Sequence, residues 1–102
     1  MKSIDVVYAK NFIRESIGLI GSKEMYSLYF ETRFGIHTFG MKVPIDVVIL
    51  DCLHKIVILK KKMNPNRVFF WNPQYYKVIE LPGGMITSLS LVRGDEISLN
   101  II

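Results

Sequence analysis

The pattern of apolar and polar positions predicts a chain made mostly of short strands. The clearest strand is Ile45–Asp51, in which apolar and mostly β-branched residues surround Asp46. A run this short and this rich in β-branched residues is typical of a central strand and too short for a buried helix. Pro44 fixes its own φ and biases Val43 towards extended geometry, so the polar loop before it enters the strand at a set angle.

Further strands are expected where short apolar runs stand between turn residues. In Ile97–Ile101 the apolar residues alternate with Ser98 and Asn100, which is the pattern of a half-buried strand. Isoleucines on one face predict a short helix over 12–20, and Met85 to Leu89 fit one helical turn. The remaining strands are predicted at 3–8, 25–30, 55–62, 68–71 and 76–81, with a loop over 31–40 and a tight turn at 52–54.

Six or seven short strands separated by turns predict a mostly β fold. We expect a β-sandwich or jelly-roll-like single domain that spans residues 1–102 and carries one or two short helices. The segment LVRGDEI, residues 91–97, also resembles the Gly-Asp turn of cradle-loop and double-psi barrels, so such a barrel is the alternative fold. In that turn Gly94 is expected to take a conformation closed to other residues, and Asp95 is expected to cap it.

Composition narrows the location and the partners. The chain is 50% hydrophobic, which strands buried on both faces explain, whereas no apolar run approaches the ~20 residues needed to span a bilayer. Asp5 interrupts the only short apolar stretch at the N-terminus, so we expect no secretory signal there. One cysteine, Cys52, allows no internal disulfide, and we therefore expect a cytoplasmic protein. The net charge of +4 permits anionic partners without requiring them.

Three blocks of residues carry a resemblance to a known family. They are Met41, Lys42, Pro44, Ile45 and Asp46; then Glu80, Leu81, Pro82 and Gly84; and finally Gly94 and Asp95. In this order they resemble the small prokaryotic family called domain of unknown function 192, with Gly83 where the family usually has alanine. Further back, Arg14, Gly18 and Leu19 resemble its Arg-x-x-x-Gly-Leu-Met, with Ile20 in place of the methionine.

The resemblance covers nearly the whole chain and implies a mostly β, sandwich- or jelly-roll-like domain. It implies no activity, because none is established for the family. Two features depart from the family pattern. The segment between Lys62 and Lys77 carries an aromatic cluster in place of the usual linker, and many relatives carry an export signal that is not expected here.

The polar residues around the loop and the central strand form the candidate site. They are Arg14, His37, Lys42, Asp46 and Glu80. Two acids with a histidine and a lysine suit general acid–base work, so the enzyme hypothesis is a small hydrolase or lyase that uses Asp46, Glu80 and His37. The structural alternative makes Asp46 a residue that caps backbone groups at the start of the strand. Glu80 is expected either in solvent or buried and paired.

No cofactor, metal or covalent nucleophile is indicated. Metal sites need three or four convergent ligands, and a lone histidine with scattered carboxylates has no ligand spacing. Cys52 lies in an apparent turn, and no serine has the context of a nucleophile elbow. We therefore assign no catalytic residue and leave open whether the protein is an enzyme.

A basic and aromatic cluster offers a second hypothesis. Its cations lie in and after one predicted strand, and its rings follow them along the chain. The cations are Lys55, Lys60, Lys61, Lys62 and Arg67, and the rings are Phe69, Phe70, Trp71, Tyr75 and Tyr76. Lysines beside stackable rings are used by proteins that bind single-stranded nucleic acid. The low net charge and the need for half of these rings to face the core argue against nucleic acid, and lysines also keep an exposed strand edge soluble. A protein or glycan contact through Trp71 is a third alternative.

The sequence therefore favours a binding or interaction module with a pocket at the junction of loop and strand, residues 37–46. We expect its partner to be an unknown small molecule or protein, and we expect no interaction with a membrane. The sequence does not determine its oligomeric state. The enzyme and the weak nucleic-acid binder are the two alternatives.

Overall fold

The computed structural model of the chain describes residues 1–9 and 27–102. Within these ranges it contains eight strands and one short helix. The strands are β1 Lys2–Tyr8, β2 Leu28–Glu31, β3 Ile36–His37, β4 Ile45–Leu50, β5 Ile56–Met63, β6 Val68–Phe69, β7 Lys77–Pro82 and β8 Ile97–Ile101, and the helix is α2, Met85–Ser88.

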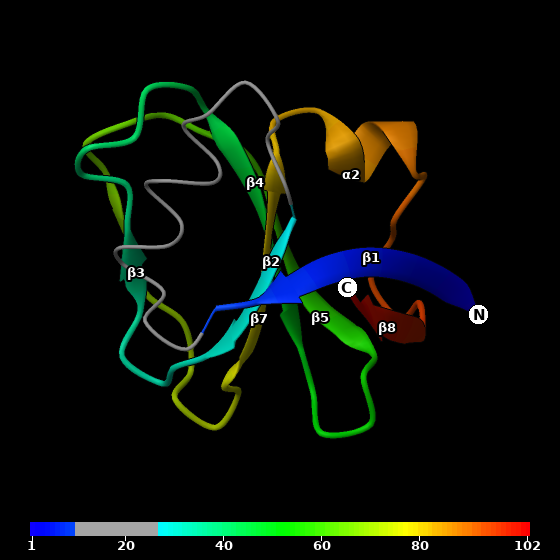
Figure 1. Cartoon of the computed structure of the whole chain (residues 1–102). Coiled ribbons are helices and arrows are strands. Elements are labelled where there is room, and N and C mark those ends of the chain that lie inside the picture. Colours follow the sequence, from blue (N-terminus) through cyan, green and yellow to red (C-terminus); the bar gives the residue numbers. More distant parts are fainter. Residues whose placement is uncertain (10–26) are drawn as a thin grey trace.

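Six of these strands form one curled sheet, a half-barrel, in the order β5-β4-β7-β2-β1-β8 (Figure 1). Strands β5, β4, β7 and β2 pair antiparallel, whereas β1 runs parallel to both of its neighbours, β2 and β8. The predicted mostly β fold is confirmed, with one curled sheet where a sandwich would have two stacked sheets. None of the described residues belongs to a helix long and apolar enough to cross a membrane.

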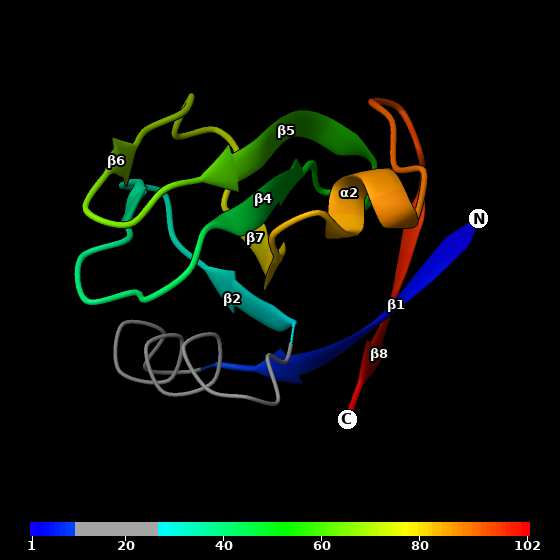
Figure 2. The ribbon, with the colours of Figure 1, turned by 90° about the horizontal axis from the view of Figure 1, so that it is seen from above.

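Strands β3 and β6 form a separate antiparallel pair, which we call the ribbon. The ribbon and α2 lie on opposite sides of the main sheet (Figure 1), and the view from above separates them again (Figure 2). The two faces of the sheet therefore bury two clusters. The cluster on the α2 side comprises Ile4, Val6, Tyr29, Val48, Leu50, Ile56, Ile79, Leu81, Ile86, Leu91 and Ile97. The cluster on the ribbon side comprises Ala9, Leu28, Phe30, Ile36, Met41, Ile45, Val47, Ile49, Met63 and Val78.

Strand β4 lies between β5 and β7, and all six of its residues are buried. This placement explains its continuous apolar sequence, because a strand covered on both faces has no side for polar residues. The prediction of a central strand at this position is confirmed. Asp46 is the exception to the apolar pattern, so its carboxylate requires partners inside the fold.

Most of the other predicted elements are present, with two differences. Ile36 and His37, which the sequence placed in a loop, pair with Phe69 and Val68 to make the ribbon. A two-residue strand leaves no periodic pattern, so the sequence could not indicate it. The predicted strand 68–71 is correspondingly shorter and ends at Phe69. The predicted helix over 12–20 and the first residues of the predicted strand 25–30 lie outside the described residues.

Strand β5 carries a bulge at its lysine-rich end. Ile45 of β4 pairs with Met63, and Val47 pairs with Lys60, so Lys61 and Lys62 together stand opposite the single residue between them on β4. Lys62 has a φ of +49°, which places it in the left-handed region. Because β5 is the edge of the sheet, its exposed lysines keep that edge from pairing with another strand.

Candidate binding site

The carboxylate of Asp46 is fully buried and is held by backbone groups. Its Oδ1 accepts a hydrogen bond from the backbone N–H of Lys62 at 2.8 Å. Its Oδ2 accepts from the N–H groups of Gly84 at 3.1 Å and Ile86 at 2.8 Å. Asp46 thus ties β4 to the bulge of β5 and to the first turn of α2, whose own N-cap residue, Gly84, has no side chain to contribute. This is the backbone-capping role that the sequence offered as the structural alternative.

Glu80 is also buried, with 2% of its surface exposed, but it is surrounded differently. On β7 it stands opposite Val47 of β4 and Leu28 of β2, which are both apolar. Among the described residues its Oε2 has no hydrogen-bond partner. Burial raises the pKa of this carboxyl to about 8, so the group is protonated at neutral pH. The sequence allowed a solvent-exposed or a paired Glu80, and the described residues provide neither.

The two acids face opposite sides of the sheet. Asp46 pairs with Leu81 and shares its face, on the side of α2, whereas Glu80 pairs with Val47 on the side of the ribbon. Side chains alternate between faces along a strand, so neighbouring register positions separate the two carboxyl groups. The acid pair that a hydrolase or lyase would need is therefore not brought together.

The other residues of the predicted site lie in or beside the loop. His37, at the end of β3, accepts a hydrogen bond at Nδ1 from the Phe39 N–H at 3.2 Å. Its ring stacks on the Phe39 ring with a centroid distance of 4.9 Å. Lys42 is exposed to solvent. Arg14 lies outside the described residues.

Thr38 fixes this loop to the turn that follows β5. Its buried hydroxyl donates a hydrogen bond to the carbonyl of Asn64 at 2.7 Å and accepts one from the backbone N–H of Arg67 at 2.9 Å. Its own backbone N–H donates to the Arg67 carbonyl at 2.9 Å, and its carbonyl accepts from Asn66 at 3.1 Å. One side chain therefore sets where the turn 64–67 lies relative to the loop.

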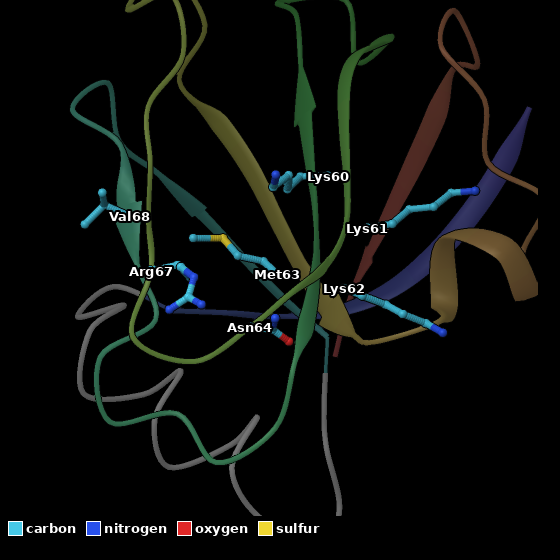
Figure 3. A pocket seen from close by; sticks show the side chains of 7 residues that line it. All are labelled: Lys60, Lys61, Lys62, Met63, Asn64, Arg67 and Val68. Atoms are coloured by element: carbon cyan, nitrogen blue, oxygen red, sulfur yellow. The ribbon is translucent and has the colours of Figure 1, made fainter.

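That turn forms one wall of a cavity of about 190 Å³, which we call the basic cavity (Figure 3). Among the described residues, those that line it are Lys60, Lys61, Lys62, Met63, Asn64, Arg67 and Val68, and none of these is acidic. Figure 3 shows the side chains of Lys60 and Arg67 on the same side of β5, with those of Lys61 and Lys62 extending away on the other side. The bulge thus divides the lysine run, and only part of it turns its ammonium groups towards the cavity.

A second depression, of about 300 Å³, lies at the start of β4. It is lined by Val43, Pro44, Lys62 and Gly83, so it coincides with the junction that the sequence singled out. Lys62 lines this depression and the basic cavity, which makes the two neighbours. The junction is thus hollowed, but its lining contributes one cation and is otherwise apolar or backbone.

The aromatic side chains divide into buried and exposed groups. Trp71, which the sequence proposed as a stacking ring, is half-buried and donates its indole N–H to the Tyr75 carbonyl at 2.7 Å. Three phenylalanines are instead exposed: Phe34 at 85%, Phe70 at 67% and Phe39 at 50%. They line a groove of about 150 Å³ on the ribbon, which we call the aromatic groove, together with Gly35, Ile36, His37 and Val68.

Thr38 and Phe39 lie within the predicted pocket at 37–46, and Arg67 and Phe70 lie within the predicted basic and aromatic cluster, but the sequence indicated no separate role for any of them. It did not indicate Phe34 at all. The Asn-Pro-Asn turn before Arg67 marks a turn without saying what it contacts. Phe34 and Phe39 stand in a loop without apolar periodicity, which was the available signal that their rings need not enter the core. Within the described part of the chain, no group of three or more His, Cys, Asp or Glu residues is placed to hold a metal.

Comparison with protein families gives one clear match. The model of the family DUF192, described as Uncharacterized ACR, matches residues 1–99. Two relatives come from species of Pyrococcus. UPF0127 protein PF1050 of Pyrococcus furiosus is 33% identical over 95% of this chain and 88% of its own length. UPF0127 protein PH1112 of Pyrococcus horikoshii is 33% identical over 91% of this chain and 85% of its own length.

Two solved structures share the fold. A protein of unknown function from Novosphingobium aromaticivorans matches with a TM-score of 0.73 and 15% identity, over 89% of this chain and 71% of that one. A protein from Sinorhizobium meliloti, named as a candidate transcription regulator, matches with a TM-score of 0.68 and 16% identity, over 89% of this chain and 78% of that one. At these identities the likeness establishes the fold alone.

Proposed function

Because the chain belongs to the DUF192 family, an uncharacterised family, we propose its function from the geometry: it is a binding module that holds an anionic ligand in the basic cavity. The observation that carries this proposal is the placement of Lys60 and Arg67 on one side of β5, around a cavity whose described lining residues include no acid. Cations that no carboxylate neutralises are available to an anion.

The charges of the cavity are not used elsewhere in the described part of the chain. There the only ion pair joins Lys2 to Asp95, at 2.8 Å. The Lys60 ammonium lies 5.9 Å from the centroid of the Phe69 ring, which keeps it on the ribbon side of β5. The Arg67 guanidinium makes one long hydrogen bond, 3.3 Å, to the carbonyl of Asn66. Within residues 1–9 and 27–102, most of its donors therefore have no partner and are available to a carboxylate or phosphate.

The loop at 37–46 supports the cavity from behind. Thr38 binds both Asn64 and Arg67, so the loop determines the position of the cavity wall. Ligand binding in the cavity should accordingly change the environment of the loop residues. The pocket predicted from the sequence at 37–46 requires such a change. Binding also fits the arrangement better than acid–base catalysis by Asp46 and Glu80, because these acids face opposite sides of the sheet.

The test is a titration with inorganic tripolyphosphate, followed by backbone amide chemical shifts. We expect shifts at Asn64, Arg67 and Val68 and, through the hydrogen bonds of Thr38, in the loop. Lys60→Gln and Arg67→Gln should each weaken binding about fivefold at low salt, the size of one charge contact, and added salt should weaken it further.

The matched control is Lys55→Gln, which removes the same charge from an exposed position just before β5, outside the cavity lining. It should change the affinity less than twofold. An equal loss in Lys55→Gln and Lys60→Gln would show a non-specific charge effect and contradict the proposal. Loss of binding in Lys42→Ala without loss in Lys60→Gln would contradict it as well, because the ligand would then lie at the junction itself.

We also infer a cytoplasmic location, as the sequence suggested. Cys52 is exposed, and an exposed thiol persists best in a reducing compartment. Fractionation of cells that express the protein with its natural start would test this inference. Recovery in an exported or surface fraction would contradict it.

A further inference from the structure

The aromatic groove exposes an unusual amount of ring surface for so small an area of the molecule. Phe34 and Phe70 are mostly exposed and Phe39 is half exposed, although each could be replaced by a polar residue without loss to the core. Clustered exposed rings on a soluble domain mark sites of interaction. The aromatic groove therefore indicates a binding partner that can cover the flat apolar faces of these rings.

Two of the three rings, those of Phe70 and Phe39, pack against the ribbon before any partner arrives. At Gly35 an added Cβ would lie 2.4 Å from Cδ1 of Phe70 and 2.7 Å from the Phe69 carbonyl oxygen, so the Phe70 ring packs directly against this glycine. The Phe39 ring stacks on His37 with an angle of 26° between the ring planes. Rings that are already ordered lose little entropy when a ligand stacks on them.

The aromatic groove adjoins the basic cavity. Val68 lines both, so flat apolar faces and the cations of Lys60 and Arg67 form one continuous surface. In the part of the chain that the structure describes, the residues that line the two parts include no acid. A ligand that complements this surface has planar rings to stack on the phenylalanines and a repeated anionic group to bind the cations.

The composition of the aromatic groove distinguishes between polymers. Protein interfaces need about one hydrogen bond per 100–200 Å², and a groove of phenylalanine, valine, isoleucine and glycine, with one histidine, offers few polar side-chain groups. Stacking of nucleic-acid bases needs no such groups and tolerates any sequence, because every base has a flat face. This comparison favours nucleic acid over a peptide.

We infer that the ribbon binds single-stranded nucleic acid, with bases stacked on Phe34, Phe70 and Phe39 and phosphates held by Lys60 and Arg67. The inference rests on the proposed function, because the same two cations bind the anionic part. Of the rings in the sequence hypothesis it keeps Phe70, but not Trp71, whose indole is partly buried and has a bonded N–H. It adds Phe34 and Phe39, which are exposed as Phe70 is. The objection that the rings face the core applies to Trp71 and Phe69, which pack against the core, and not to these three.

The experiment compares two labelled strands of equal charge by fluorescence anisotropy. One is an oligothymidylate of about twelve residues, and the other has the same length and phosphate count but abasic sites throughout. We expect the oligothymidylate to bind at least about tenfold more tightly at low salt. Thymidine monophosphate, the third probe, should bind much more weakly than the strand, because one nucleotide covers only one ring.

The variants separate stacking from charge. Phe34→Ser and Phe70→Ser should each lower the affinity for oligothymidylate about fivefold or more and leave the affinity for the abasic strand unchanged. Leu53→Ser is the matched control, because Leu53 is 66% exposed, close to the 67% of Phe70, but lies in the turn before β5, outside the aromatic groove. Its affinity should match that of the parent. A thermal midpoint like that of the parent establishes that each variant is folded.

The outcomes distinguish this inference from the proposed function. Equal affinities for the two strands, with no effect of Phe34→Ser, would overturn base stacking and leave anion binding by Lys60 and Arg67 standing. The same result would arise if a protein were the natural occupant of the aromatic groove. If thymidine monophosphate bound as tightly as the oligothymidylate, the inference that the ligand is a nucleic-acid strand would be overturned. Absence of binding to both strands and to tripolyphosphate would overturn both proposals.

Discussion

At the scale of the residue, the two buried acids of the sheet differ in how their oxygens are satisfied. Asp46 accepts three backbone hydrogen bonds from the bulge of β5 and from the start of α2. Glu80 stands between apolar neighbours, and its Oε2 has no partner among the described residues. The first acid therefore supports the fold through its bonds, whereas the second remains in the core by keeping its proton.

Replacement of Asp46 should unfold the protein more readily. Asp46→Ala leaves three buried or partly buried N–H groups without an acceptor, so we expect a loss of about 3–5 kcal/mol in the free energy of unfolding. Asp46→Asn keeps one oxygen and should lose clearly less. Urea denaturation measures both, and an Asp46→Ala midpoint equal to that of the parent would contradict the structural role of this carboxylate.

Because the pKa of Glu80 is raised by burial, we predict that the free energy of unfolding falls as the pH rises. The pKa of its carboxyl is about 8 in the folded protein and near 4.5 in the unfolded chain, so the folded state binds the extra proton between these values. The contribution is fully present below about pH 4.5 and is lost by about pH 8, at about 1.4 kcal/mol per pH unit.

The measurement is urea denaturation of the parent and of Glu80→Gln across this pH range. The variant cannot titrate at this position, so the difference between the two free energies should change along the predicted slope while all other groups cancel. A constant difference between pH 5 and pH 8 would show that the Glu80 carboxyl titrates alike in both states.

At the scale of the element, the ribbon depends on one glycine. Gly35 has a φ of +89°, and an added Cβ would meet the Phe69 carbonyl oxygen and the Phe70 ring. Gly35→Ala should therefore lose about 2 kcal/mol or more of stability and shift the amide signals of the ribbon. Gly94→Ala is the control, because Gly94 has a φ of +91° and no atom within 4 Å of the added Cβ. Gly94→Ala should therefore cost only the backbone strain. An equal loss of stability in the two variants would show that the contact with Phe69 and Phe70 at Gly35 has no additional effect.

The elements with a strong pattern could be predicted, and those made by pairing could not. The buried run of β4 and the alternation of β8 specify strands by themselves. The ribbon depends on two pairs of residues that lie about thirty positions apart, Ile36 with Phe69 and His37 with Val68. The bulge in β5 likewise depends on its alignment with β4. Neither alignment leaves a local signal in the sequence.

The same limit explains the outcome at the candidate site. The sequence analysis grouped Asp46 with Glu80 as polar residues near the loop and the central strand. Glu80 aligns with Val47 and not with Asp46, and a difference of one residue in register moves a side chain to the other face. The lysine run was visible, but the bulge that divides it was not, and Thr38 acquires its role only from the turn at 64–67.

At the scale of the whole molecule, the sheet should be protected most strongly at its centre. β4 and β7 lie between paired strands and are largely buried, whereas β8 is an edge strand whose last residues are exposed. Native-state hydrogen exchange should therefore find the slowest amides in β4 and β7, which open only with global unfolding, and faster ones in β8. Equal protection of β8 and β4 would contradict this order.

The parallel pairing of β1 with β8 has a consequence for biosynthesis. Lys2 aligns with Ile97 and Val6 with Ile101, so the two strands that close this side of the sheet are made at very different times. At the usual pace of translation, about 5–20 s separate the emergence of the first strand from that of the second. During that interval one edge of the nascent β1 is unpaired. Ile4 and Val6 are not yet packed against Ile97, which joins them in the folded core. The pairing of β1 with β8 can therefore form only after the other strands of the sheet have been synthesised.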